Sequence, residues 1–309
     1  MRIVFMGTPE SAVRSLDRLI NDGHEVVSVW TQPDKPAGRG DKIHLPAVKR
    51  FALEHNLKLE QPAKIRTDEA KALFSSYKAD VGVVVAYGRI LPQEFLVAPK
   101  RGCINVHFSL LPKYRGAAPA NWAIVNGEKE TGVTTMFIEE ELDSGPILLQ
   151  RETALAQTET APQLMERLSS IGADLLSETL HHLDTITPRR QDEAEATFAP
   201  LLTRHHGLID WTMPAVDIER RVRGFQPWPN AYTQHKDKRL IIWAAEAAET
   251  AVDDSGPGEI IEARGGELIV KAGHGSALRI VELQPESKRR MSVLDFLNGT
   301  HLQAGESFG

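Results

Sequence analysis

Short apolar runs alternate with amphipathic stretches through the first half of the chain. The runs that predict strands occupy residues 2–6, 25–30, 81–86 and 103–107. The third run has no polar alternation, which is typical of a parallel strand covered by helices on both faces. Strands separated by helical segments predict an α/β, Rossmann-like, doubly wound and mainly parallel sheet. We expect a ligand crevice beyond the carboxyl ends of its strands.

The pattern changes after residue 184. Residues 161–183 carry apolar side chains at helical spacing and predict one long amphipathic helix. Residues 185–206 are polar and proline-containing, which is the composition of a linker. Short β-prone runs split by turn residues then predict a small β-barrel over residues 207–309. Within it, the Ala/Glu-rich residues 244–251 are expected to be a surface excursion. The expected catalytic domain is therefore residues 1–184.

The turn after the first strand contains Gly7, Thr8 and Pro9. Thr8 is expected to be the N-cap of the next helix and Pro9 its first residue. The turn lacks the remaining glycines of a dinucleotide fingerprint, so we interpret it as a tight βα turn and not as a nicotinamide site. A dehydrogenase is therefore disfavoured.

Composition narrows the class of protein. The 309 residues are 41% hydrophobic and 25% charged, as in ordinary folded domains. A net charge of −6 argues against a protein that coats nucleic acid, so any RNA contact must be local. Cys103 is the one cysteine, which excludes an internal disulfide and a cysteine zinc cluster and favours a reducing compartment such as the cytoplasm. The apolar runs are too short for a signal peptide or a membrane span.

Three polar residues are candidates for chemistry. Asn105 and His107 stand two apart on a predicted strand, so both project to the same face. Asp143 follows another predicted strand, residues 133–138. A carboxylate beside an imidazole orients it and favours its protonated form, and an amide supplies a neutral donor to an oxyanion. The set suits acyl transfer to an amine, although polar residues at strand ends are often turn formers or satisfied core groups.

A local positive excess lies in residues 35–50. Its basic residues are Lys35, Arg39, Lys42, Lys49 and Arg50, against the single acid Asp41. Such a loop can grip phosphates, and the glycines on either side of Arg39 favour ordering on binding. A merely solvated charged loop is the alternative.

One long stretch resembles a known signature. Residues 102–119 read GCINVHFSLLPKYRGAAP, and they resemble the signature of the 10-formyltetrahydrofolate-dependent formyltransferases. The resemblance extends to residues 131–136 (TGVTTM) and 142–145 (LDSG). It implies that Asn105, His107 and Asp143 are the catalytic trio of a formyl transfer that requires no metal.

The same resemblance implies where a reduced folate binds. Its formyl-bearing region is expected against one wall and its pteridine ring near a second. The residues implied are Ser109, Leu110, Leu111 and Pro112 in the first wall and Val85, Tyr87, Gly88, Ile90 and Leu91 in the second. Phe108 stands where some relatives carry glycine.

Within the family, residues 31–40 (TQPDKPAGRG) resemble an insertion used against the acceptor end of a tRNA, which purine-pathway formyltransferases lack. Residues 6–10 (MGTPE) and 223–229 (RGFQPWP) resemble the same members. The resemblance implies a monomer with an OB-like second domain, which formylates the α-amino group of methionine on initiator methionyl-tRNA for translation initiation. The tRNA contacts implied are Lys35, Arg39, Lys42, Lys288 and Arg289.

Two alternatives stay open. The first is the same chemistry on another amine, such as a sugar nucleotide or a purine precursor, in which case the charged loop would be idle. The second is a noncatalytic RNA-binding protein that keeps the fold, against which the intact Asn105, His107 and Asp143 set argues.

Overall fold

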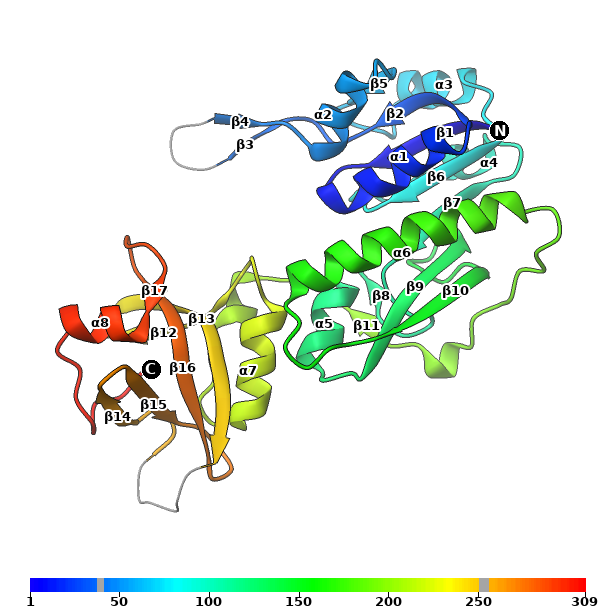
Figure 1. Cartoon of the computed structure of the whole chain (residues 1–309). Helices are drawn as coiled ribbons and strands as arrows, with labels where there is room; N and C mark the ends of the chain where they lie inside the picture. Colours follow the sequence, from blue (N-terminus) through cyan, green and yellow to red (C-terminus); the bar gives the residue numbers. More distant parts are fainter. Residues whose placement is uncertain (38–41, 250–255) are drawn as a thin grey trace. The chain divides into compact units, whose positions relative to one another are not determined.

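The computed structural model describes residues 1–37, 42–249 and 256–309, with no side-chain description for residues 35–37, 42–44 and 249 (Figure 1). The described chain forms two compact units. The α/β unit comprises Met1–Pro119, Glu130–Ala154 and Met165–Pro200. The β-rich unit comprises Ala120–Lys129, Leu155–Leu164 and Leu201–Gly309. None of the helices in the described ranges combines the length and the apolar character needed to cross a membrane.

A seven-stranded mixed sheet organises the α/β unit, in the order β10-β9-β7-β6-β1-β2-β5. Its strands are β1 (Arg2–Gly7), β2 (Glu25–Trp30), β5 (Leu59–Glu60), β6 (Val81–Val85), β7 (Cys103–His107), β9 (Glu130–Phe137) and β10 (Ile147–Ala154). The first five are mutually parallel, whereas β9 and β10 run antiparallel at one edge. The predicted mainly parallel sheet is confirmed.

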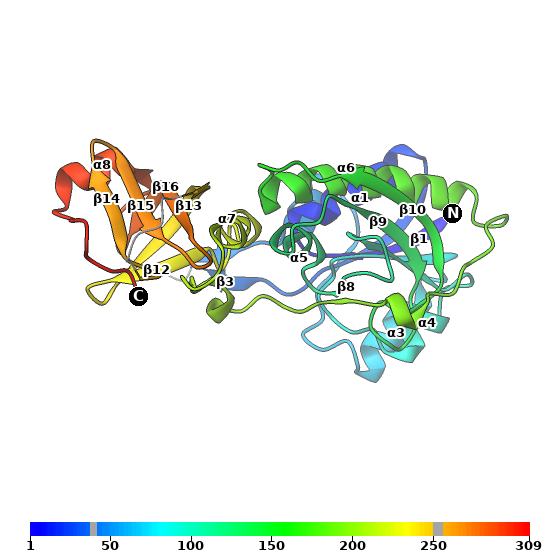
Figure 2. The same ribbon diagram turned by 90° about the horizontal axis from the view of Figure 1, so that it is seen from below.

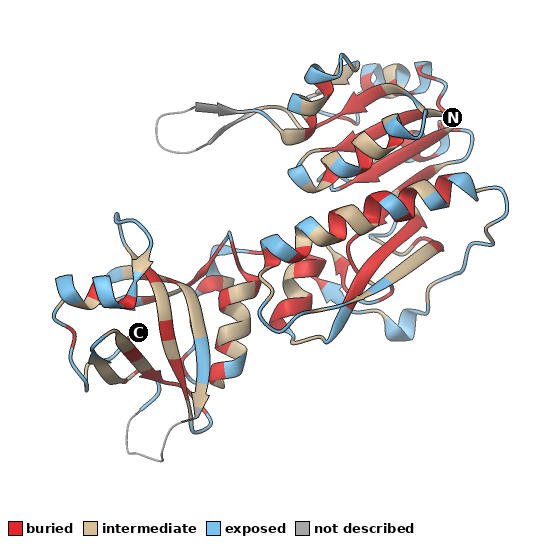
Figure 3. Cartoon of the chain, in the orientation of Figure 1, coloured by how far each residue is buried: buried red, intermediate tan, exposed pale blue. Residues whose placement is uncertain are grey.

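Helices cover both faces of this sheet. The elements are η1 (Glu10–Ala12), α1 (Val13–Asn21), α2 (Ala47–Glu54), α3 (Asp68–Ser76), α4 (Gln93–Val97) and α6 (Ala161–His181). Figure 2 shows α1 and α6 on one face and α3 and α4 on the other. Every residue of β6 is buried, as the unbroken apolar run predicted (Figure 3). The aromatic rings of Trp30, Phe74 and Phe95 pack together beneath α3 and α4.

The predicted start of the first helix is wrong by one residue. Pro9 is the N-cap, in an extended conformation, and the 3-10 turn η1 begins at Glu10. The Thr8 hydroxyl donates instead to the carbonyl of Tyr87 at 3.0 Å. It therefore fastens β1 to the segment after β6.

Two small sheets complete the α/β unit. Strand β3 (Lys35–Ala37) pairs with β4 (Lys42–His44), and β8 (Arg115–Gly116) pairs with β11 (Phe198–Ala199). The expected linker, residues 185–206, thus contains β11 and the turn η2 (Glu193–Glu195). The domain boundaries expected from the sequence stay a prediction.

An antiparallel sheet organises the β-rich unit, in the order β12-β13-β16-β15-β14, with β17 beside β16. Its strands are β12 (Ala231–His235), β13 (Lys238–Glu249), β14 (Ile260–Arg264), β15 (Glu267–Lys271), β16 (Ser276–Pro285) and β17 (Met291–Ser292). Its helical elements are α5 (Pro119–Val125), η3 (Arg204–Gly207), α7 (Ala215–Gly224) and α8 (Val293–Gly299). Among the described strands, no pairing joins β12 to β14 and closes the sheet.

The core of the β-rich unit forms between α7 and this sheet. Ile218 and Val222 of α7 are buried with Leu240 and Ile242 of β13. The expectation of a surface excursion is wrong for residues 244–249, because β13 continues through them and pairs with β16.

Candidate active site

Asn105 and His107 lie on β7 near the carboxyl end of the sheet. Asn105 pairs through its backbone with Val84 of β6 and Met136 of β9, and its side chain is half-buried. None of the hydrogen bonds between described residues involves its side-chain amide. The amide therefore keeps its donors for a ligand.

His107 is held from one side and faces a carboxylate on the other. The residue is 5% exposed, and its Nε2 lies 2.9 Å from the carbonyl oxygen of Tyr114. Because a carbonyl only accepts, Nε2 carries a hydrogen. Nδ1 lies 3.7 Å from Oδ2 of Asp143, within ion-pair range but too far for a hydrogen bond. Nδ1 is therefore the ring nitrogen left for proton exchange.

Asp143 projects from a tight turn, residues 142–145, between β9 and β10. Its backbone has φ 52°, in the left-handed region that aspartate tolerates better than most residues. A Cβ on Gly145 would lie 1.9 Å from the carbonyl oxygen of Phe137, so the turn requires glycine there. Oδ2 of Asp143 accepts the N–H of Gly116 at 2.9 Å. The structure thus brings Asp143 to His107 from the loop that follows the neighbouring antiparallel strand β9.

Several hydrogen bonds hold the first predicted folate wall, Ser109–Pro112. Ser109 Oγ donates to the carbonyl of Lys113 at 2.6 Å, and the N–H of Leu111 donates to Thr134 Oγ1 at 3.1 Å. Gln150 Nε2 donates to the carbonyl of Leu111 at 2.8 Å. Ser109, Leu111 and Pro112 are buried, and Leu110 is half-buried. Leu110 is therefore the wall residue most accessible to a ligand.

The second predicted wall divides between core and surface. Val85 and Tyr87 are buried, and burial raises the pKa of the Tyr87 hydroxyl. Gly88 has φ 78° and is exposed, and a Cβ there would lie 2.3 Å from Gln32 Nε2. Ile90 and Leu91 line a hollow of about 380 Å³ together with Arg66, Lys71, Pro92, Gln93, Glu94 and Glu140. Val85 and Tyr87 therefore belong to the core, whereas Ile90 and Leu91 line the hollow.

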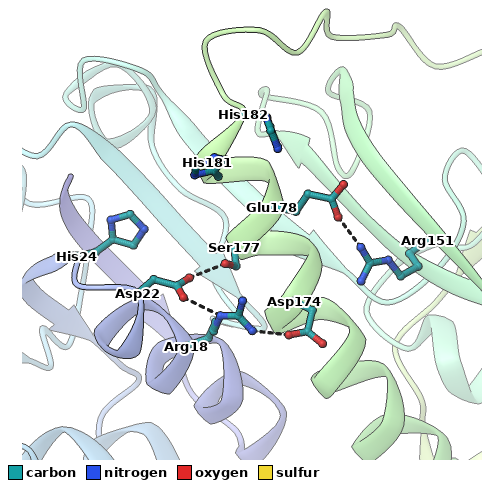
Figure 4. Close-up of a pocket in the computed structure, with 9 residues that line it drawn as sticks. All are labelled: Arg18, Asp22, His24, Arg151, Asp174, Ser177, Glu178, His181 and His182. Carbon is teal, nitrogen blue, oxygen red and sulfur yellow. Dashed lines mark hydrogen bonds and ion pairs between the residues drawn. The ribbon is translucent and has the colours of Figure 1, made fainter.

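A larger hollow of about 560 Å³ lies between α1 and α6, and Figure 4 shows the residues that line it. We call it the α1/α6 cleft. Arg18 contacts Asp22 at 2.8 Å and Asp174 at 2.5 Å, and Arg151 pairs with Glu178. No member of the predicted trio lines this cleft.

The predicted tRNA contacts are only partly described. Arg39 lies outside the described residues, and so do the side chains of Lys35 and Lys42, whose backbones form β3 and β4. Lys288 and Arg289 lie in the turn between β16 and β17, where both are exposed. Neither side chain forms an ion pair with a residue that the structure describes.

The structure adds two residues that the sequence did not single out. Arg115, 4% exposed, contacts both carboxylate oxygens of Glu193 at 2.8 Å, and these hydrogen bonds raise its pKa. Gln191 Nε2 donates to the carbonyl oxygens of Asp143 at 2.7 Å and Gly145 at 2.8 Å. Arg115 stood inside the quoted motif. Gln191 stood in a segment with no periodicity that could have indicated it.

Comparison with known families identifies the family of both parts of the chain. Residues 1–180 match the formyl transferase family, and residues 201–301 match the family's C-terminal domain. The chain belongs to the formyl transferase family. Two similar proteins are the methionyl-tRNA formyltransferases of Caldanaerobacter subterraneus subsp. tengcongensis and Citrifermentans bemidjiense, each 47% identical. The alignments cover 99% of both chains for the first, and 100% of this chain and 96% of the relative for the second.

Solved structures share the fold at lower identity. An N-formyltransferase from Helicobacter canadensis, in complex with folinic acid and dTDP-3-aminofucose, matches with a TM-score of 0.66 and 18% identity, over 92% of this chain and 98% of that one. HypX from Aquifex aeolicus, in complex with tetrahydrofolic acid, matches with a TM-score of 0.64 and 19% identity. That match covers 96% of this chain and 47% of HypX, so this chain spans about half of HypX.

Proposed function

We propose that this protein transfers the formyl group of 10-formyltetrahydrofolate to the α-amino group of methionine on initiator methionyl-tRNA, which yields N-formylmethionyl-tRNA for translation initiation. The observation that carries the proposal is identity of 44–47% along the whole chain to proteins named methionyl-tRNA formyltransferase. The site supports it because an amide that no described residue uses and an imidazole facing a carboxylate suit acyl transfer to an amine.

Asn105 would stabilise the negative charge of the reaction. The amine nitrogen attacks the formyl carbon, and the carbonyl oxygen becomes negative as the new C–N bond forms. The side-chain amide of Asn105 is available to donate to this oxygen because no described residue uses it. One such donor typically contributes about 10² to 10³ in rate.

His107 and Asp143 would move the proton. As the formyl carbon leaves the folate nitrogen, the amine must lose a proton and the leaving nitrogen must gain one. Nδ1 of His107 is suited to this exchange because Nε2 is committed to Tyr114. Asp143 stabilises the imidazolium from 3.7 Å. Such proton transfer typically contributes about 10² to 10⁴ in rate, and no step in the scheme calls for a metal.

The folate would lie against the two predicted walls. Leu110 offers an accessible apolar side chain in the hydrogen-bonded Ser109–Pro112 segment. Ile90 and Leu91 offer apolar surface in a hollow that also holds Arg66 and Lys71. Apolar walls with a few charged groups suit a flat heterocycle that carries an anionic tail.

Initiator tRNA would be held by basic side chains of both domains. Lys288 and Arg289 are exposed and free of acidic partners among the described residues, so they are available to phosphates. We assign Lys35, Arg39 and Lys42 to the acceptor end on the resemblance of their loop. We assign residues 1–184 to catalysis, 185–206 to a linker, and 207–309 to an OB-like module that binds tRNA. We expect a cytoplasmic monomer.

The test is transfer of a labelled formyl group from 10-formyltetrahydrofolate to initiator methionyl-tRNA by the purified chain. Free methionine and a dTDP-linked amino sugar are the alternative acceptors. We expect label in the tRNA alone, with a rate that falls steeply as salt increases. Transfer to the amino sugar and not to the tRNA would overturn the assigned substrate, and no transfer to any amine would overturn the assigned chemistry.

A further inference from the structure

We propose that Gln191 is a positioning residue for formyl transfer, whose side-chain amide holds the turn 142–145 so that the Asp143 carboxylate faces His107. This inference rests on the proposed function. Nothing in the polar segment around Gln191 identifies it from sequence. Its position relative to the site comes from the fold alone.

The side-chain amide of Gln191 uses both of its N–H groups on one turn. Nε2 donates to the carbonyl of Asp143 at 2.7 Å and to that of Gly145 at 2.8 Å. Apart from these contacts, the one hydrogen bond to Asp143 within the described chain comes from the N–H of Gly116 to Oδ2. The amide therefore fixes the backbone of Asp143, while Gly116 fixes its carboxylate.

Gln191 is itself oriented by an ion pair between the buried Arg115 and the exposed Glu193. Its Oε1 accepts from Arg115 Nε at 3.0 Å, and Arg115 in turn contacts Glu193 through two hydrogen bonds. The acceptor role of Oε1 determines which end of the amide points at the turn. Arg115 also lies between Tyr114, whose carbonyl accepts from His107, and Gly116, whose N–H binds Asp143. Gln191 and Arg115 are thus connected to both groups that face the His107 imidazole, the carbonyl of Tyr114 and the carboxylate of Asp143.

The segment that carries Gln191 is fastened at both ends. We call residues 189–199 the strap. At one end, Arg189 and Ile147 exchange two backbone hydrogen bonds of 2.8 Å. At the other, Thr197 accepts from the N–H of Tyr114 at 2.9 Å through Oγ1 and from the N–H of Arg115 at 2.8 Å through its carbonyl. The strap therefore delivers the amide to the turn from a fixed backbone.

Gly116 shows how closely the strap lies over the motif. A Cβ at this residue would stand 2.5 Å from the carbonyl oxygen of Ala199, and its φ of 128° also favours glycine. The carbonyl of Ala199 accepts from the N–H of Ala117 at 2.9 Å. The end of the strap is thus hydrogen-bonded directly to the backbone of the signature motif. We therefore expect a substitution of the Gln191 side chain to affect the turn 142–145 and to leave the pairing between β8 and β11 intact.

The expected effect of losing the amide is on the rate and not on binding. None of the hydrogen bonds that Gln191 makes to described residues reaches either predicted folate wall, so we expect its removal to leave the KM values for folate and tRNA in place. A misplacement of about 1 Å at a reacting group can lower a rate by about 10²-fold. We expect kcat of Gln191→Ala to fall by about 10- to 100-fold, because the second anchor at Gly116 remains.

Two substitutions separate positioning from general destabilisation. Gln191→Glu keeps the size and the acceptor for Arg115 but places an oxygen against the two carbonyls. It should lower kcat as much as Gln191→Ala does, in assays at a temperature where urea unfolding shows both variants to be folded. Glu195→Gln is the matched control, since Glu195 is exposed on the same strap and makes no hydrogen bond through its side chain to a described residue. It should keep the wild-type kcat.

The deciding experiment is a double-mutant cycle with Asp143→Asn. If Gln191 acts through Asp143, Gln191→Ala lowers kcat strongly in the wild type and hardly at all in the Asp143→Asn protein. Equal losses in both backgrounds, or a Gln191→Glu protein with full kcat, would overturn the inference. A loss confined to KM would overturn it as well.

Amide hydrogen exchange tests the role of Gln191 without relying on any formyl-transfer activity. The N–H of Gly116 and the turn 142–145 should exchange faster in Gln191→Ala than in the wild type, whether or not the chain formylates any amine. Unchanged exchange would show that Gln191 does not hold the turn. A wild-type protein that transfers no formyl group would overturn the proposed function while the exchange result still stands.

Discussion

The α1/α6 cleft and the end of strand β7 both gather polar and charged side chains in the α/β unit, but they use them in opposite ways. In the cleft, Arg18 contacts two carboxylates and Asp22 also accepts from Ser177 at 2.5 Å (Figure 4). At the end of β7, the amide of Asn105 has no partner among the described residues. Nδ1 of His107 stays 3.7 Å from Asp143.

This difference teaches that neither size nor charge identifies a site. The cleft is the larger hollow, about 560 Å³ against about 380 Å³ for the one beside Ile90 and Leu91, and it holds more ionisable groups. Its ions neutralise one another, so they fasten α1 to α6. A reacting ligand requires protein groups that are still able to form hydrogen bonds with it, and the end of β7 retains such groups.

Replacement of His107 should produce the largest effect. His107→Ala removes the proton-transferring group, so we expect kcat for formyl transfer to fall by about 10² to 10⁴. It also removes the hydrogen bond from His107 Nε2 to the carbonyl of Tyr114, which should lower the free energy of unfolding by about 1–3 kcal/mol. Single-turnover assays and urea unfolding measure the two effects. His182→Ala, in the cleft and exposed, is the control and should leave kcat unchanged.

Replacement of Asn105, unlike replacement of His107, should lower kcat with little change in the free energy of unfolding. Asn105→Ala removes an amide to which no described residue hydrogen-bonds. We therefore expect kcat to fall by about 10² to 10³ while the free energy of unfolding changes by less than about 1 kcal/mol. Asn105→Asp, which keeps the size but places negative charge near the developing oxyanion, should be at least as slow. Full activity in either variant would show that the unused amide does not mark the reaction centre.

The sequence predicted those features that depend on local rules. The unbroken apolar run of β6 predicted a strand buried on both faces, and the two-residue spacing of Asn105 and His107 predicted a shared face. Asp143 was predicted to come from an adjacent strand end, and it does follow the adjacent strand β9. That strand is antiparallel to β7, however, so the loop after it brings Asp143 to His107. Cys103 lies on β7, and burial raises the pKa of its thiol to about 12.

Features that depend on distant pairing could not be predicted. The Ala/Glu-rich residues 244–249 have weak strand propensity, but their pairing with β16 makes them part of β13. The hydroxyl of Thr8 is suited to capping a helix, yet it donates a hydrogen bond to the carbonyl of Tyr87 instead. Gln191 is the strongest case, because its two acceptors are backbone carbonyls about fifty residues away and carry no sequence signature.

The cleft should respond to mutation through stability alone. Arg18→Ala breaks ion pairs with Asp22 and Asp174, whose side chains are partly exposed, so we expect a loss of about 0.2–1 kcal/mol in the free energy of unfolding. The loss should shrink at high salt, because exposed charges are screened. Urea unfolding at low and high salt measures it. A drop in formyl transfer by this variant would show that the cleft serves the reaction and would remove the contrast with the end of β7.

The smallest effect concerns His24, which lies in the same cleft and whose pKa is lowered by burial and by the neighbouring N-terminal amine. The unfolded chain has the ordinary histidine pKa of about 6.5. Above that pH both states hold a neutral ring, so the contribution of His24 to stability is fully present. As the pH falls below it, the unfolded state binds the proton first and the wild type loses stability.

The free energy of unfolding of the wild type relative to His24→Gln should therefore fall between about pH 8 and pH 5, which urea unfolding of both proteins across that range measures. Because Asp22 acts in the opposite direction on His24, the fall should be steeper in an Asp22→Asn background. If the free energy of unfolding of the wild type relative to His24→Gln rose on acidification, the pKa of His24 could not be lowered in the folded protein.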